Sequence, residues 1–188
     1  MEEQQPIKKT KPVIKSGHTE ELVDHYWGTI NYLTSLIKAS ELKAGLILSF
    51  YGILLNFIYQ GTESFSSQLN NDTILYILIG AWILCTSASI FFCIRCFIPK
   101  IEGNFSTNMF FFKDIITKFG DVKEFSRTFL NKSKDEDELF MQLGEQIFII
   151  SKISDWKFKN VSRAISLLAI GLIILFITGL YHVIFIFT

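Results

Sequence analysis

The fold is decided by residues 164–188, which read AISLLAIGLIILFITGLYHVIFIFT. This stretch has no charged residue, and at a rise of roughly 1.5 Å per residue a helix of this length crosses the hydrocarbon core of a bilayer. A helix buried in a water-soluble core rarely stays uncharged over so many residues. The stretch therefore predicts a transmembrane helix over residues 164–187.

Two earlier stretches have the same character. Residues 44–62 read AGLILSFYGILLNFIYQGT, and residues 73–94 read TILYILIGAWILCTSASIFFCI. Both are uncharged and mostly apolar, so we expect transmembrane helices over residues 44–62 and 73–98, joined by a short outer loop into an antiparallel hairpin. The sequence thus predicts an all-α membrane protein with three transmembrane helices and a helical cytoplasmic region between the second and third.

The positive charges predict the orientation. All 18 Lys and Arg lie in residues 1–43, at Arg95 or in residues 99–163, and none lies in residues 61–72 or after Arg163. Because cytoplasmic segments beside membrane spans carry an excess of Lys and Arg, we expect the N-terminus and residues 99–163 in the cytoplasm and the C-terminus outside. The first 40 residues have no apolar core of a removable signal peptide, so the first span itself would insert.

The N-terminal segment divides into a tail and a helix. Residues 1–18 are polar and contain two of the three prolines, which predicts a mobile cytoplasmic tail. Thr19 is the expected N-cap of an amphipathic helix over residues 19–43, where apolar side chains recur at helical spacing. Nothing in the sequence separates this helix from the first span, so we expect the helix to run on into it.

Residues 99–163 are predicted to be helical as well. A short helix over residues 109–119 is expected to end at Gly120, and Asp121 is the expected N-cap of a second helix that begins DVKEF. After the acidic residues 135–138, apolar residues recur at helical spacing with no Pro before the third span. The pattern predicts one helix of about fifty residues, on the order of 75 Å long, that would couple cytoplasm and membrane mechanically.

One face of the first span carries small and polar residues: Gly45, Ser49, Gly52 and Asn56. Helices approach closely through such faces, and the Asn56 amide must find a hydrogen-bond partner on another helix or in water. Two interpretations stay open, a helix-packing contact and the wall of a membrane path for ions.

The cytoplasmic mouth of the spans carries Glu41, Lys43 and Arg95, whose long side chains can reach the headgroup layer.

Enzyme and metal chemistry are not expected. The chain has no phosphate-binding glycine loop, HExxH or GxSxG motif, so catalytic residues are expected to be none. Cys93 and Cys96 form CxxC with no further ligand nearby, and we interpret them with Cys85 as packing residues, which leaves no metal or cofactor. Residues 100–163 carry eleven basic and ten acidic residues, a balance that does not favour binding to nucleic acid.

Several segments resemble the Pycsar effector family, the membrane effectors of the pyrimidine cyclase antiphage system. The similar segments are ASELKAGLILSFYGILL, CIRCFIPK, NMFFFKDI, DVKEFSRTFL and LGEQIFIISKISDWKFKNVSRAI. They occur in the same order and with the same placement of spans over roughly residues 30 to 180, and this shared order carries the resemblance. Glu41 stands where the family often has Asp, and the tail before residue 20 lies outside the resemblance.

The resemblance implies a role in bacterial antiphage defence at the cell inner membrane. A partner cyclase makes cyclic UMP or cyclic CMP on infection, the effector responds, and the inner membrane loses integrity, which causes abortive infection. The implied partners are the cyclic nucleotide, the lipid bilayer and further copies of the chain in a homo-oligomer. No catalysis by this chain is implied.

For such a ligand we look to basic and aromatic side chains in the cytoplasmic region. Cations can bind the phosphate, and an aromatic ring can stack on the base. The candidates are Lys113, Lys118, Arg127, Trp156, Lys157, Lys159 and Arg163. Two other functions remain open, a membrane effector gated by a cyclic dinucleotide or oligonucleotide and a ligand-free scaffold built on the long helix as a coiled coil.

Overall fold

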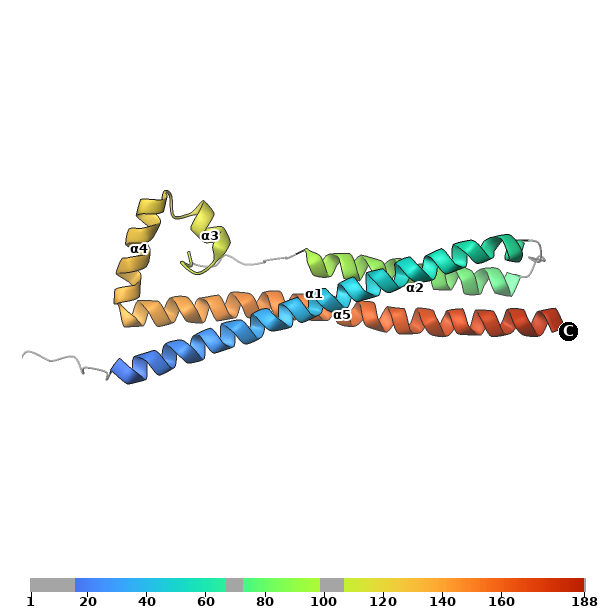
Figure 1. Ribbon diagram of the computed structural model, residues 1–188, viewed down its shortest axis with the longest axis horizontal. Helices are drawn as coiled ribbons and strands as arrows, with labels where there is room; N and C mark the ends of the chain where they lie inside the picture. Colours follow the sequence, from blue (N-terminus) through green and yellow to red (C-terminus); the bar gives the residue numbers. More distant parts are fainter. Residues whose placement is uncertain (1–15, 67–72, 99–106, 188) are drawn as a thin grey trace, which may run out of the picture.

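The computed structural model describes residues 16–66, 73–98 and 107–187, and within them the chain is helical with no strand (Figure 1). Most of the predicted tail, residues 1–15, lies outside the described residues, and so do residues 67–72 of the predicted outer loop. The five helices are α1 (Ser16–Ser66), α2 (Thr73–Phe97), α3 (Phe112–Thr117), α4 (Val122–Lys134) and α5 (Glu136–Phe187).

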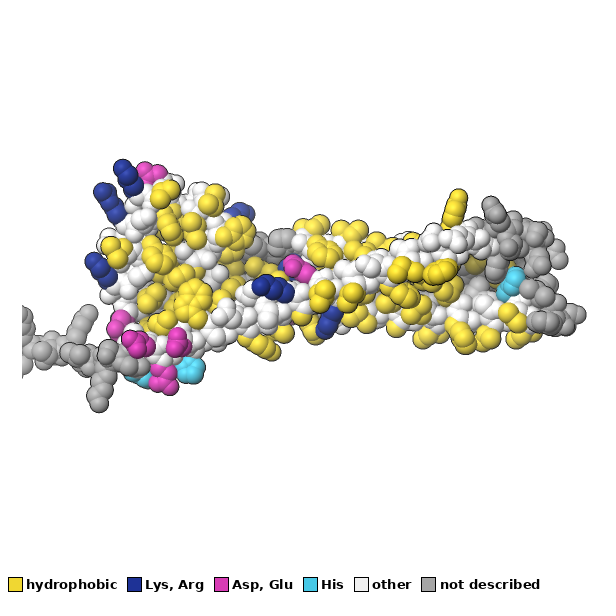
Figure 2. Space-filling view, viewed as in Figure 1, with side chains coloured by type: hydrophobic (Ala, Val, Ile, Leu, Met, Phe, Trp, Pro, Cys, Tyr) yellow, Lys and Arg dark blue, Asp and Glu magenta, His cyan; other side chains and the backbone are white. Residues whose placement is uncertain are grey.

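Three helices, α1, α2 and α5, run lengthwise beside one another and are long and apolar enough to cross a membrane (Figure 1). Only 17% to 22% of the residues in their most apolar windows are buried inside the protein. Figure 2 shows apolar side chains over the half of the molecule that lies away from α3 and α4, which we call the apolar half. Most of the charged side chains lie at the opposite end. Such an apolar exterior is what a bilayer solvates, and the predicted class, an all-α membrane protein with three spans, is confirmed.

Two of the three spans continue out of the apolar half without a break. The helix expected over residues 19–43 and the first span are one helix, α1, and the long helix expected before the third span is α5, with 52 residues. The prediction of Thr19 as an N-cap is wrong, because α1 begins at Ser16 and Thr19 lies inside its first turns, where its hydroxyl donates to Glu136 Oε1 at 3.3 Å.

The three long helices pack through positions that recur every seven residues. On α5, Lys157, Ala164, Gly171 and Thr178 are all buried, and on α2 the buried positions include Leu75, Trp82, Ser89 and Cys96. On α1, Ala44 and Tyr51 have the same spacing. A seven-residue period is the signature of coiled-coil packing, in which one seam of each helix faces its neighbours. We call this buried interior of α1, α2 and α5 the seam.

Helices α3 and α4 stand at the end of α5 that lies away from the apolar half (Figure 1), and we call residues 107–134 the cap. Gly120, expected to end the first of its helices, has a φ of 68°, and a Cβ at that position would collide with the Glu124 carboxylate. The predicted N-cap of α4 is confirmed, since Asp121 Oδ1 accepts a hydrogen bond from the Glu124 N–H at 2.8 Å.

The first cap helix is shorter than the predicted 109–119, because residues 108–111 form a turn that docks on α5. Asn108 is fully buried, and its Nδ2 donates to the Gln142 carbonyl at 2.7 Å while its backbone N–H donates to Asp114 Oδ2 at 3.0 Å. The Met109 N–H donates to Gln142 Oε1 at 2.9 Å. Phe110 follows and packs edge-on against Trp27 of α1, so the turn contacts both α1 and α5.

Replacing Asn108 with Ala is expected to release this turn. The substitution leaves buried polar groups unpaired, and each such group costs about 1–3 kcal/mol. Hydrogen exchange of the amides in residues 109–119, followed by mass spectrometry, should rise by roughly 10- to 100-fold. Ser126→Ala is the matched control, because that exposed hydroxyl only bonds back to the Val122 carbonyl on its own helix. Unchanged exchange in the Asn108→Ala protein would show that this contact does not hold the cap.

Candidate functional site

The three long helices are tied together at one buried cation, Lys157 of α5. Its Nζ lies 2.6 Å from Glu41 Oε1 of α1 and donates to the Cys96 carbonyl of α2 at 2.8 Å. The Cys96 thiol returns a hydrogen bond to the Lys157 carbonyl at 3.6 Å. The Lys157 side chain is 3% exposed and that of Glu41 is 37% exposed. We call Glu41, Cys96 and Lys157 the lysine junction.

The junction depends on where α2 ends. The last carbonyls of a helix have no partner within it and form the negative end of the helix dipole. Because α2 ends at Phe97, the Cys96 carbonyl is one of these groups and accepts from the buried ammonium. The Glu41 carboxylate supplies the opposite charge that a buried ammonium requires. One residue of α5 therefore fixes both the end of α2 and the position of α1.

Further contacts join α2 to α5 on either side of the junction. The Ser89 hydroxyl donates to the Ala164 carbonyl at 2.8 Å, and both residues are fully buried. The Arg95 guanidinium lies 4.5 Å from the centre of the Trp156 ring, and that of Arg163 lies 5.6 Å from the centre of the Phe92 ring. Cations held over aromatic faces in this way are attracted to the ring quadrupole.

The structure separates the sequence-predicted ligand residues into two groups. Lys113, Lys118 and Arg127 belong to the cap, while the other four candidates lie on α5 around the junction. From the start of α5, beside the cap, to Lys157 is roughly 30 Å at 1.5 Å per residue. The seven residues therefore do not form one site.

Most of these candidates already have partners. Lys157 is enclosed in the junction, Lys118 pairs with Asp114 at 3.1 Å and Lys159 pairs with Asp155 at 2.7 Å. Trp156 and Arg163 take part in the ring contacts with α2 described above, with Trp156 half-buried. Lys113 is exposed on α3.

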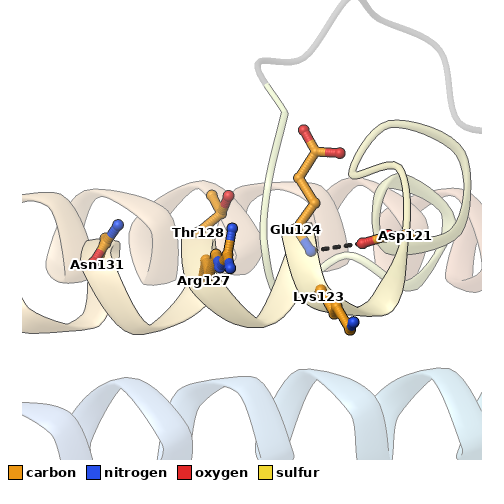
Figure 3. Close-up of a pocket in the computed structure, with 6 residues that line it drawn as sticks. All are labelled: Asp121, Lys123, Glu124, Arg127, Thr128 and Asn131. Atoms are coloured by element: carbon orange, nitrogen blue, oxygen red, sulfur yellow. Dashed lines mark hydrogen bonds between the residues drawn. The ribbon is translucent and has the colours of Figure 1, made fainter.

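Arg127 is in a different situation. It is exposed, it has no ion-pair partner among the described residues, and it lines a shallow depression of about 510 Å³ on α4. Figure 3 shows that all six lining side chains come from α4 and the N-cap before it. The lining residues are Asp121, Lys123, Glu124, Arg127, Thr128 and Asn131. The depression thus offers two cations and two carboxylates together with a hydroxyl and an amide group.

The predicted face of the first span points away from the other helices except at one end. A Cβ on Gly45 would lie 3.9 Å from the Phe97 ring, but Ser49, Gly52 and Asn56 are exposed, and Gly52 has nothing within reach of a Cβ. The Ser49 hydroxyl bonds back to the Gly45 carbonyl at 3.0 Å. At the predicted mouth, Glu41 and Arg95 face α5, whereas Lys43 is exposed.

Sequence reasoning named Glu41 and Lys157 but not their pairing, and it missed Asn108 as a contact between segments. A signal was available for the seam, because Lys157, Ala164, Gly171 and Thr178 follow a seven-residue period into the third span. No comparable signal marks Asn108. Within the described residues, no cluster of three or more His, Cys, Asp or Glu is placed to hold a metal ion.

Known proteins are similar to this chain over a region that includes both the seam and the cap. The family model described as the Pycsar effector protein domain matches residues 25–184. The chain is also similar to the Pycsar effector protein PtPycTM of Propioniciclava tarda, with 22% identity over 156 residues, which is 80% of this chain and 75% of the relative. No solved structure matches the chain.

Replacing Lys157 with Ala should destabilise the three-helix packing more than any surface change nearby. Removing one partner of a buried ion pair costs about 3–5 kcal/mol, and we expect the lower end because water reaches Glu41. Thermal unfolding in detergent can be followed with a thiol-reactive dye that reports exposure of the buried Cys93 and Cys96. Glu41→Gln should have a smaller effect, since the amide oxygen still accepts a hydrogen bond.

Lys159→Ala is the matched control for Lys157→Ala. Lys159 lies two residues after Lys157 on α5 and forms an exposed ion pair with Asp155. Exposed pairs contribute about 0–1 kcal/mol, so this protein should melt close to the wild type. Equal melting temperatures for the two variants would contradict a structural role for the junction.

Proposed function

Since this chain belongs to the Pycsar effector protein family, a family of antiphage defence, we propose that it responds to a cyclic pyrimidine nucleotide, cUMP or cCMP, by impairing the bacterial inner membrane. The observation that carries this proposal is α5, one uninterrupted helix of 52 residues that begins beside the cap and ends in the apolar half. It connects a polar region with room for a ligand to helices that can cross a membrane. The chain acts in this proposal without catalysis.

The orientation in this proposal follows from the distribution of charge. Lys and Arg occur in the cap and in the segments beside it but not in residues 61–72 or after Arg163. The positive-inside rule then puts the N-terminus and the cap in the cytoplasm, where a cyclase releases its product, and the C-terminus in the periplasm.

For the ligand we propose the depression on α4. Its volume of about 510 Å³ lies within the range of small-molecule sites, roughly 300–1,000 Å³. Arg127 and Lys123 would bind the singly charged cyclic phosphate, and Thr128 and Asn131 offer donors and acceptors for the edge of the pyrimidine. The Asp121 carboxylate already caps α4. Lys113 of the neighbouring α3 adds to the positive field of the cap.

The second group of candidates, Trp156, Lys157, Lys159 and Arg163, would act in coupling rather than in binding. Trp156, Lys157 and Arg163 contact side chains of α1 or α2 and sit where α5 passes from the cap half to the apolar half. A ligand shifts the balance between two packings only by its differential affinity for them. Binding at the cap would therefore have to favour an α5 position that the closed junction does not allow.

A homo-oligomer is part of the proposal. Asn56 is exposed on α1 in a stretch that spans the membrane, and an amide facing hydrocarbon without a partner is unfavourable. The small residues Ser49 and Gly52 on the same face allow close approach of another helix, so a second copy of the chain can supply the partner.

Leakage of a small dye from liposomes that contain the purified protein tests the function. We expect leakage with cyclic UMP or cyclic CMP and none with cyclic AMP or a cyclic dinucleotide, because the site is proposed to recognise the pyrimidine edge. Leakage with the cyclic dinucleotide alone would support the related effector class instead. If no nucleotide changes leakage of folded, correctly oriented protein, the ligand-free scaffold, which the seven-residue repeat of buried positions favours, takes the place of the gated effector.

Replacing Arg127 with Ala tests the proposed ligand site. Hydrogen bonds between a cation and an anion contribute about 1.5–3 kcal/mol, so the nucleotide concentration for half-maximal leakage should rise roughly 10- to 100-fold. Lys134→Ala is the control, because Lys134 is an exposed cation on the same helix but outside the depression. If the Arg127→Ala and Lys134→Ala proteins need the same nucleotide concentration for half-maximal leakage, the depression is not the ligand site.

A further inference from the structure

The seam combines small side chains with polar groups that have no partner. Around the middle of the three helices the small residues Ala44, Ser89, Cys93 and Ala164 are buried beside larger apolar ones. Small residues at membrane helix interfaces let the backbones approach closely. The interior of this bundle therefore combines small side chains with larger ones, which are Ile47, Tyr51, Val161 and, farther along, Trp82.

Three polar atoms inside this interior lack any hydrogen-bond partner: the hydroxyl of Tyr51, the hydroxyl of Thr86 and the side-chain carbonyl of Asn160. The three residues are 2%, 5% and 2% exposed, so lipid headgroups and bulk water do not reach them. The Tyr51 hydroxyl of α1 lies beside Ser89 and Thr86 of α2 without reaching hydrogen-bond geometry with either.

Unpartnered buried polar groups call for an explanation, because most such groups in native proteins are paired with protein or with ordered water. Each costs about 1–3 kcal/mol while it stays dry. A packing that admits water to the seam would recover part of this cost at several positions together. The closed seam is thus more favourable to hydration than an interior of Leu and Ile side chains would be.

The groups follow one another from the lysine junction inward. Lys157 closes one end of the seam, Asn160 lies one turn farther along α5, and Ala164 bonds to Ser89 in the next turn. Tyr51 and Thr86 lie beside Ser89, and Thr178 is a further buried hydroxyl on the same face of α5. From Lys157 to Thr178 is roughly 30 Å along the helix, about the thickness of the hydrocarbon core.

We propose that this seam, which begins at Lys157 and is lined by Asn160, Tyr51, Ser89 and Thr86, is the path that takes up water and small ions when the effector opens. The inference rests on the proposed function and deepens it, because it assigns the membrane lesion to the interior of each three-helix unit. The outer face of α1 with Ser49, Gly52 and Asn56 is then a contact surface and not the path. Opening requires Lys157 to leave Glu41 and the Cys96 carbonyl.

Labelling of single cysteines tests whether the seam or the outer face of α1 becomes accessible to water. One protein keeps only Cys93, with Cys85→Ala and Cys96→Ala, which preserves the backbone carbonyl that Lys157 uses. The matched protein has all three cysteines replaced by Ala and carries Ser49→Cys on the outer face of α1, close in sequence to Ile47 and Tyr51, which cluster with Cys93. Both are reconstituted in liposomes and treated with a charged, membrane-impermeant methanethiosulfonate.

Thiols react as thiolates, which form in water and not in an apolar interior, so cyclic UMP or cyclic CMP should speed labelling of Cys93 by about tenfold or more. Labelling of the Ser49→Cys protein should stay unchanged. If the nucleotide causes leakage while Ser49→Cys is labelled and Cys93 is not, the outer face is the path and the proposal is wrong although the function stands. If no nucleotide causes leakage, the function fails and the seam proposal fails with it.

A second variant removes the two hydroxyls with little change of shape, Tyr51→Phe combined with Thr86→Val. Because neither hydroxyl has a partner in the closed state, this protein should melt at the wild-type temperature or above. Its nucleotide-dependent leakage should be at least about tenfold slower, since hydration of the seam loses two of its polar groups. Wild-type leakage from a protein that folds normally would overturn the assignment of the seam.

Discussion

The arrangement of the molecule depends on a single buried ammonium. Lys157 needs a negative charge and further acceptors, and it receives them from two different helices, the Glu41 carboxylate of α1 and the Cys96 carbonyl at the end of α2. Moving any of the three helices along its axis would break a contact of that charge, and breaking a buried ion pair costs about 3–5 kcal/mol. The apolar surfaces bring the helices together, and the ammonium determines how they are aligned.

The interior of the apolar half reflects a compromise between packing and polarity. Small residues on a seven-residue period let α2 and α5 approach closely enough for the Ser89 hydroxyl to reach the Ala164 carbonyl. The same choice leaves the Tyr51 and Thr86 hydroxyls buried without partners. A core without such polar groups would offer water nothing, so the observed composition agrees with the proposed opening of the bundle.

The fold could be predicted from the sequence where one segment decides the outcome alone. Uncharged apolar stretches predicted the spans, and Asp121 after Gly120 predicted the start of α4, because both signals are local. The burial of Lys157 could not be read in this way, since a lysine near a membrane usually extends to the headgroups and only the meeting of three helices buries this one. The docking of Asn108 on Gln142, between residues 34 positions apart, is likewise a property of the tertiary structure, and it shortened the predicted helix. The residues predicted to bind a ligand are divided between the cap and α5, because charge and aromatic character mark candidates without saying which lie together.

The continuity of α5 has a mechanical consequence. A helix without Pro or a break does not change its length, so a movement of the cap reaches the apolar half as a tilt or a rotation of the whole rod. Lys157, where α5 is held to α1 and α2, divides α5 into arms of roughly 30 Å toward the cap and 45 Å toward the C-terminal end. The longer arm lies in the apolar half. If α5 tilted about Lys157, the C-terminal end would therefore move about one and a half times as far as the cap end, in the opposite direction. In the proposed function, the binding of one small molecule at the cap would thus produce a larger displacement at the membrane end of α5.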